Sequence, residues 1–176
     1  MKKIILFALM FGVFAGLSQA QSVPHGDASI GYSYFRMGGS GGLNQNGVSG
    51  SVAFNANQWL GVVADIGGYH GSPAGASVNT YTFLFGPRFS YRSAGRIVPF
   101  AQTLFGGSHL TAAAGGFSGS SSPFAWSLGG GVDLPITARD TIALRPQVDY
   151  VGLHANGATT NCTRISVGLV FRFGQK

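Results

Sequence analysis

Charged side chains are scarce in this sequence. Only 9% of its 176 residues are charged, whereas soluble domains carry about 25%. A water-facing surface needs more charge than this to remain dispersed. Intrinsic disorder is not an alternative explanation, because the sequence contains 14 Phe, 6 Tyr and 2 Trp. The composition therefore disfavours an ordinary soluble enzyme.

Cysteine and clustered positive charge are also scarce. The single cysteine, Cys162, excludes an intramolecular disulfide framework. We expect it to be buried or packed at a rim of the fold, with pairing between molecules as the alternative. Beyond the N-terminal leader the Lys and Arg residues are scattered singly, whereas a nucleic-acid surface needs them clustered. We therefore expect no nucleic-acid partner.

The N-terminus has the three parts of a secretory signal peptide. Two lysines precede the apolar run Ile4–Leu17, and small residues ending at Ala20 form a cleavage motif. The apolar run is shorter than the roughly 20 residues that a membrane-spanning helix needs. We predict that residues 1–20 are a cleaved signal peptide and that residues 21–176 form one exported domain.

After residue 20 no apolar run reaches the length of a membrane helix, so a membrane location would require strands. Apolar side chains instead alternate with small or polar ones at period two, interrupted by Gly, Ser and Asn clusters. In residues 78–91, for example, Tyr81 and Phe83 share one face, while Thr80 and Thr82 share the other. The eight predicted strands are 27–37, 46–56, 59–70, 78–91, 98–110, 123–135, 141–153 and 163–173. The alternation in 98–110 is too weak to assign its faces.

The connections alternate in length along the chain. They are short near 57–58, 92–97 and 136–140, and mostly longer near 38–45, 71–77, 111–122 and 154–162. An even number of strands of about ten residues, with this alternation, is typical of outer-membrane barrels. The pattern predicts an all-β fold, namely an eight-stranded antiparallel up-and-down transmembrane β-barrel with short periplasmic turns and longer extracellular loops.

Side-chain volume indicates which face of the barrel points outward. Soluble lipocalin-like barrels also have eight strands, but the interior of such a barrel only just accommodates its side chains. The face rich in Phe, Tyr, Trp and Leu is too bulky for that space, so we expect it to contact lipid. Aromatic side chains near strand ends then form interfacial girdles, with generic packing as the alternative for each. The predicted interfacial aromatics are Tyr32, Tyr34, Trp59, Tyr69, Tyr91 and Tyr150.

The opposite face carries a few charged residues at similar depths. An unpaired charge in a narrow lumen is costly, so opposite charges should pair there. We expect three pairs, Asp133–Arg145, Asp149–Arg164 and Asp65–Arg88, with Arg172 joining the first. The predicted lumen network is thus Asp65, Arg88, Asp133, Arg145, Asp149, Arg164 and Arg172. It is either a plug that fixes strand register or a gated path, and eight strands favour the plug.

Catalytic and metal-binding constellations are not predicted. His70, His109 and His154 end alternate strands at one rim, where alternate strands do not touch and no carboxylate cluster accompanies them. Asp27 and Asp140 fall at the opposite end, which hinders assembly of a Ser-His-Asp triad. We therefore expect no catalytic, metal-binding or cofactor-binding residues.

Several fragments, in their order and spacing, resemble the small outer-membrane β-barrel domain family, which includes the membrane domain of OmpA-type proteins and OmpX/Ail-type barrels. These fragments are Gly61–Gly68, Pro99–Gln102, Leu128–Asp133, Arg145–Tyr150 and Phe171–Phe173. The resemblance implies a monomer in a bacterial outer membrane with periplasmic N- and C-termini. Its expected partners are outer-membrane lipid and the barrel-assembly machinery.

Members of that family serve as structural, adhesive or small-solute proteins. We expect a structural or surface-interaction role without catalysis for this chain. The alternatives are a narrow small-solute pore and a lipid-modifying outer-membrane enzyme.

Overall fold

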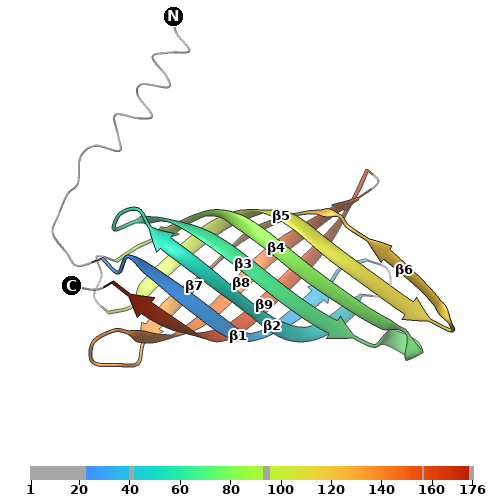
Figure 1. Cartoon of the computed structure of the whole chain (residues 1–176), viewed down its shortest axis with the longest axis horizontal. Coiled ribbons are helices and arrows are strands. Elements are labelled where there is room, and N and C mark those ends of the chain that lie inside the picture. The colour runs from blue at the N-terminus through green and yellow to red at the C-terminus, as the bar shows by residue number, and fades with distance from the viewer. Residues whose placement is uncertain (1–22, 40–41, 93–95, 156, 175–176) are drawn as a thin grey trace, which may run out of the picture.

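The computed structural model describes residues 23–39, 42–92, 96–155 and 157–174 (Figure 1). The predicted signal peptide, residues 1–20, lies outside the described residues. No helix in the described ranges is both long and apolar enough to cross a membrane. The elements are β1 (Gly26–Met37), β2 (Leu43–Asn55), β3 (Leu60–Gly71), the 3-10 turn η2 (Pro73–Gly75), β4 (Ser77–Ser90), β5 (Val98–Ala114), β6 (Phe117–Ser121), β7 (Phe124–Pro135), β8 (Ile142–Ala155) and β9 (Ala158–Phe173).

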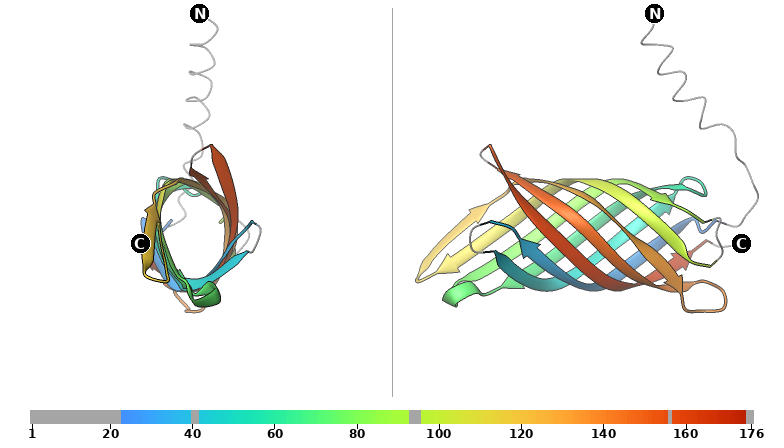
Figure 2. Two further views of the ribbon diagram at one scale, coloured as in Figure 1. Left: turned by 90° about the vertical axis from the view of Figure 1, so that its right-hand side faces the viewer. Right: turned by 180° about the vertical axis from the view of Figure 1, so that it is seen from behind.

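The strands form one antiparallel sheet that closes on itself. Their order is β4-β3-β2-β1-β9-β8-β7-β5-β6, and an additional pairing of β4 with β5 completes the ring (Figure 2). Strand β6 pairs with the last residues of β5, and β7 pairs with the earlier ones, so the two together occupy one position in the wall. The barrel wall therefore has eight strands in up-and-down order, as the alternation predicts.

Two segments expected to be loops instead continue the ladder as hairpins. Strand β5 extends to Ala114 and turns through Gly115 and Gly116, whose φ angles of 56° and 85° suit a two-residue hairpin turn. The hairpin of β8 and β9 extends similarly to the pair Ala155–Ala158. Sequence alternation did not reveal these extensions because Gly, Ala, Ser and Thr dominate both of their faces. Both hairpins project beyond the closed part of the barrel (Figure 2).

Large apolar side chains cover the outside of the barrel. In β4 every second residue from Thr80 to Ser90 is buried, while Phe83 and Phe85 on the other face are 58% and 61% exposed. An exposed aromatic and aliphatic surface of this extent is incompatible with water and compatible with lipid. Strand β5 carries large apolar side chains on both faces, because its inward face includes Phe100 and Leu104. This mixture explains why the sequence alone could not assign its faces.

The interior combines apolar and charged side chains. One cluster of buried, largely apolar side chains comprises Phe35, Ala53, Val63, Tyr69, Leu84, Leu104, Ala125, Val151, Leu153 and Cys162. Cys162 is buried there, as expected. The interior face is thus less uniformly small and polar than the sequence suggests. The charged side chains occupy the middle of the lumen and the part toward the chain termini, where Ala53 and Val63 of the cluster also lie.

Candidate functional site

Eight charged side chains, four aspartates and four arginines, line the inside of the barrel. They come from β1, β3, β4, β7, β8 and β9, on which the strand alternation directs them inward. The eight are Asp27, Asp65, Asp133, Asp149, Arg88, Arg145, Arg164 and Arg172, and each takes part in at least one ion pair. Equal numbers of opposite charges leave this set with no net formal charge.

Arg164 connects opposite walls of the barrel. Its guanidinium, carried by β9, donates to Asp65 on β3 at 2.7 Å and to Asp149 on β8 at 2.9 Å. Strands β3 and β8 are four positions apart in the eight-stranded wall and therefore face each other. Arg164 is buried and also contacts the Tyr69 hydroxyl at 3.2 Å. This single side chain consequently closes the middle of the lumen.

A second group of ion pairs lies nearer the chain termini. Arg145 donates to both carboxylate oxygens of Asp133, at 2.6 and 2.9 Å, and to Asp27 at 3.1 Å. The bidentate geometry is the strong form of an arginine–carboxylate contact. Asp27 also accepts from Arg88 at 3.2 Å, and Arg172 donates to Asp133 at 3.1 Å. These contacts tie five strands together at one level.

Neutral side chains join the two groups. Gln102 accepts from Arg88 at 3.0 Å and donates to Asp149 at 3.3 Å. The ring of Phe100 lies 4.7 Å from the Arg88 guanidinium and 4.8 Å from that of Arg145, within range of cation–π attraction. The inward phenylalanine of β5 is therefore part of the charged network rather than an interruption of it.

All seven predicted lumen residues face inward, but the pairing differs in one place. Asp133 contacts Arg145, Asp149 contacts Arg164, and Arg172 joins Asp133, as expected. The expected Asp65–Arg88 pair is wrong. Among the described side chains, Asp65 pairs with Arg164 and Arg88 pairs with Asp27 instead. Barrel shear sets which residues share a level, and shear is not visible in a single sequence.

Asp27 is a network member that sequence reasoning missed. It lies buried on β1, where it bridges Arg88 and Arg145. The signal was present, because Ser29 and Ser33 on the same strand have the same parity and also face inward.

Five of the six predicted interfacial aromatics face outward. Tyr32, Trp59, Tyr91 and Tyr150 are exposed, and Tyr34 is half-buried on the same face of β1 as Tyr32.

Tyr69 is the exception and corrects the prediction. It is 2% exposed, stacks on Phe35 with ring centroids 4.6 Å apart, and bonds Arg164 inside the lumen. The reason is parity: Tyr69 lies four residues after Asp65 on β3, so both point inward. Gly67 leaves room for the phenol, since an added Cβ there would collide with the Tyr69 hydroxyl.

The three rim histidines are exposed and bonded locally. The Nδ1 atoms of His70, His109 and His154 lie 2.8, 2.9 and 2.9 Å from side-chain oxygens of Asn79, Ser122 and Thr159, respectively. Within the described ranges, His, Cys, Asp and Glu side chains form no group of three or more that could hold a metal ion.

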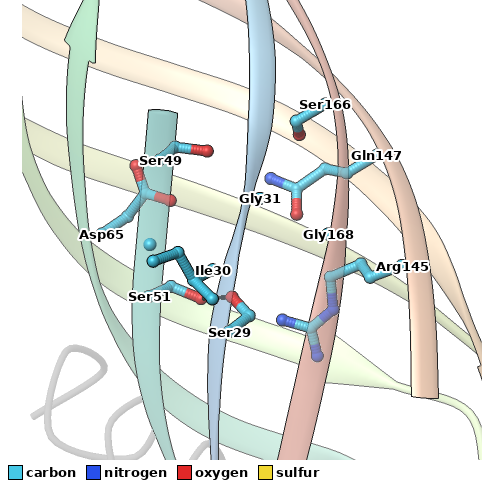
Figure 3. Close-up of a pocket in the computed structure, with 11 residues that line it drawn as sticks. Ser29, Ile30, Gly31, Ser49, Ser51, Asp65, Arg145, Gln147, Ser166 and Gly168 are labelled. Carbon is cyan, nitrogen blue, oxygen red and sulfur yellow. Dashed lines mark hydrogen bonds between the residues drawn. The ribbon is translucent and has the colours of Figure 1, made fainter. Parts of the chain in front are cut away.

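A small polar cavity remains beside the network. It has a volume of about 20 Å³, and its lining includes Ser29, Ser51, Asp65, Arg145 and Gln147 (Figure 3). That volume suits one or two water molecules. Arg145 Nη1 is buried and has no hydrogen-bond partner in the described part of the chain, so a water here would satisfy it.

Comparison with known proteins gives a family and a fold. Residues 5–173 match the family model described as "Outer membrane protein beta-barrel domain". A comparison with curated proteins gave no significant match.

Three solved structures are similar in fold. Neisserial surface protein A is 12% identical, with a TM-score of 0.72 over 85% of this chain and 97% of that chain. Ail, the attachment invasion locus protein of Yersinia pestis, is 16% identical, with a TM-score of 0.64 over 85% and 99%. OprG of Pseudomonas aeruginosa is 9% identical, with a TM-score of 0.56 over 88% and 99%. At these identities the likeness shows the fold alone.

Proposed function

Because this chain belongs to the outer membrane protein beta-barrel domain family, we propose that it is a closed, non-catalytic anchor presenting its hairpins at the cell surface. The main observation in support is that side chains fill the lumen. Arg164 bridges opposite walls, and buried, largely apolar side chains pack in the lumen beside it. A conducting pore would need a continuous polar path through the lumen.

The distribution of charge supports an orientation with both termini in the periplasm. The first residue of β1, Gly26, pairs with the last residue of β9, Phe173, so the chain begins and ends at one end of the barrel. At the other end, the connections within 38–45, 71–77, 111–122 and 154–162 contain no Lys, Arg, Asp or Glu. The charged turn residues Arg92, Arg96, Arg139 and Asp140 all lie at the terminal end. Uncharged hairpins cross a bilayer at lower cost than charged ones.

A surface role follows from this orientation. The two projecting hairpins would extend past the membrane on a wall stiffened by the charged network. The name of Ail, a similar barrel, records attachment and invasion, which supports contact with other molecules as the use of such hairpins. We further propose that the protein is a monomer, surrounded by outer-membrane lipid and inserted by the barrel-assembly machinery.

Two experiments test the proposal. In planar bilayers the purified protein should give no ion conductance, and steady channel openings would instead support the narrow pore. For orientation, Ser120→Cys and Ala138→Cys are compared in a Cys162→Ser background, since both residues are exposed at opposite ends. A membrane-impermeant maleimide should label Ser120→Cys on intact cells and Ala138→Cys only after lysis, and the reverse result would invert the orientation.

A further inference from the structure

A shallow apolar groove crosses the outer face of β1, β2, β3 and β4. Its volume is about 350 Å³, and two outward glycines, Gly50 and Gly68, form its floor. Bulky side chains stand around it: Ile30, Val48, Ile66, Tyr81 and Phe83. The groove is thus a local depression in the lipid-facing band, flanked by these larger side chains.

Internal packing does not require the glycine at position 68. An added Cβ at Gly68 would meet the Tyr81 ring at 3.5 Å, an ordinary contact. At inward Gly47 and Gly106, by contrast, an added Cβ would collide with backbone carbonyls of Gly68 and Phe83. Glycine weakens a strand, and it often marks a place where a ligand approaches the backbone closely. The outward glycine therefore points to an occupant outside the wall.

The groove changes from apolar to polar toward the hairpins. Cross-strand partners Val48, Gly68 and Tyr81 form one row across the sheet. The next outward-facing row is Asn46, His70 and Asn79, with Ser72 Oγ 3.2 Å from His70 Nε2. All five acidic residues lie elsewhere, four in the lumen and Asp140 in a turn at the terminal end. This polar row can therefore receive an anionic or hydroxyl-rich group without carboxylate repulsion.

The polar row lies at the height where lipid headgroups begin. His70 is ten residues along β3 from Leu60, and a strand tilted by about 40° gains about 2.5 Å of height per residue. The resulting height of about 25 Å equals that of the apolar band of such barrels. The groove below it lies in the half of the band nearer the hairpins.

We propose that this groove binds one acyl chain of a phosphorylated glycolipid of the outer leaflet. Gly50 and Gly68 admit the chain to the backbone, and Ile66 and Phe83 flank it. His70 and its amide neighbours contact the sugar or phosphate of the headgroup. The assignment to the outer leaflet rests on the proposed orientation.

Native mass spectrometry of the detergent-solubilised protein tests this site, with purified hexa-acyl lipid A as the probe. The wild type should retain one lipid A, in preference to dimyristoylphosphatidylcholine. Gly68→Leu should weaken retention about tenfold, equivalent to about two methylene groups losing contact with the wall. The matched control is Gly107→Leu, an outward glycine in the row beyond Phe83, where an added Cβ meets no heavy atom closer than 4.0 Å. It should leave retention within about twofold.

Gly68→Ala provides a second variant should the leucine variant not fold, and it should give a smaller loss in the same direction. Equal retention by wild type and Gly68→Leu, an equal loss in Gly107→Leu, or no preference over phosphatidylcholine would each overturn the proposal. A dimer lost on Gly68→Leu would assign the groove to a second copy of the chain and also overturn it. None of these outcomes alters the conductance or maleimide results, so the site and the proposed function are tested separately.

Discussion

Replacing Asp149 with alanine should destabilise the barrel more than any change at a surface ion pair. Asp149 is 0% exposed and accepts hydrogen bonds from Arg164, Gln147 and Gln102 at 2.9, 2.8 and 3.3 Å. Its removal leaves Arg164 with less compensation for its burial and leaves two amide donors short of an acceptor. Loss of one partner of a buried ion pair costs about 3–5 kcal/mol.

Further penalties for the two amides are not simply additive with that figure. Water can enter the space vacated by the carboxylate, since the neighbouring cavity already suits one or two molecules. We therefore expect the free energy of unfolding to fall by about 3–5 kcal/mol in total. The matched control is Arg96→Ala, because the Arg96–Asp140 pair has side chains 60% and 35% exposed. Such a surface pair contributes at most about 1 kcal/mol.

The assay is urea unfolding of the barrel in phospholipid vesicles, followed by tryptophan fluorescence and by mobility on unheated gels. A loss below about 1 kcal/mol for Asp149→Ala, matching Arg96→Ala, would refute the stabilising role of the network. The variant Asp149→Asn separates charge from volume, because it removes the carboxylate charge and keeps the size of the side chain. If the lost charge causes the destabilisation, Asp149→Asn should lose nearly as much stability as Asp149→Ala. If a cavity causes it, Asp149→Asn should recover most of the loss.

Three further changes probe the interior by the same unfolding assay or by labelling. Tyr69→Phe removes one hydrogen bond to Arg164 and should cost about 1 kcal/mol, so an unchanged midpoint would count against that bond. Gly67→Ala places a methyl group against the Tyr69 hydroxyl, and this overpacking should lower the free energy of unfolding by about 1–3 kcal/mol. An unchanged free energy of unfolding would contradict the close contact. The buried Cys162 thiol should resist maleimide in the folded barrel and react in urea, as measured by intact mass; rapid labelling of the folded form would contradict its burial.

Strands with bulky aromatic side chains on one face could be predicted well from the sequence. In β4 the pairs Tyr81–Thr82 and Phe83–Leu84 include one member per face, and the repeated outward aromatics make the parity clear. Strand β5 defeated this reasoning because inward Phe100 packs between two guanidinium groups rather than in an apolar core. The hydropathy of a residue therefore indicated whether it faces lipid or the lumen only where the lumen-facing side chains are charged or small.

Contacts across the lumen depend on geometry that one sequence does not contain. Asp133 and Arg145 lie on adjacent strands and could be matched by counting from their shared turn. Asp65 and Arg164 lie on strands three positions apart, and matching them requires the stagger of the whole ring. Tyr69 was misassigned for a different reason, since nearness to a strand end was given more weight than parity with Asp65.

The network depends on the seam between the first and last strands. Asp27 enters from β1, and Arg164 and Arg172 enter from β9, so the two ends of the chain supply three of its eight charges. In an open sheet Asp27 would lie far from Arg145 and Arg164 far from Asp65, and these groups would remain hydrated. The lumen can exclude water from them only after β1 meets β9. We therefore expect closure to be all-or-none, with no partly zipped species detectable by gel mobility during refolding, because Asp27 reaches Arg145, and Arg164 reaches Asp65, only across the finished seam.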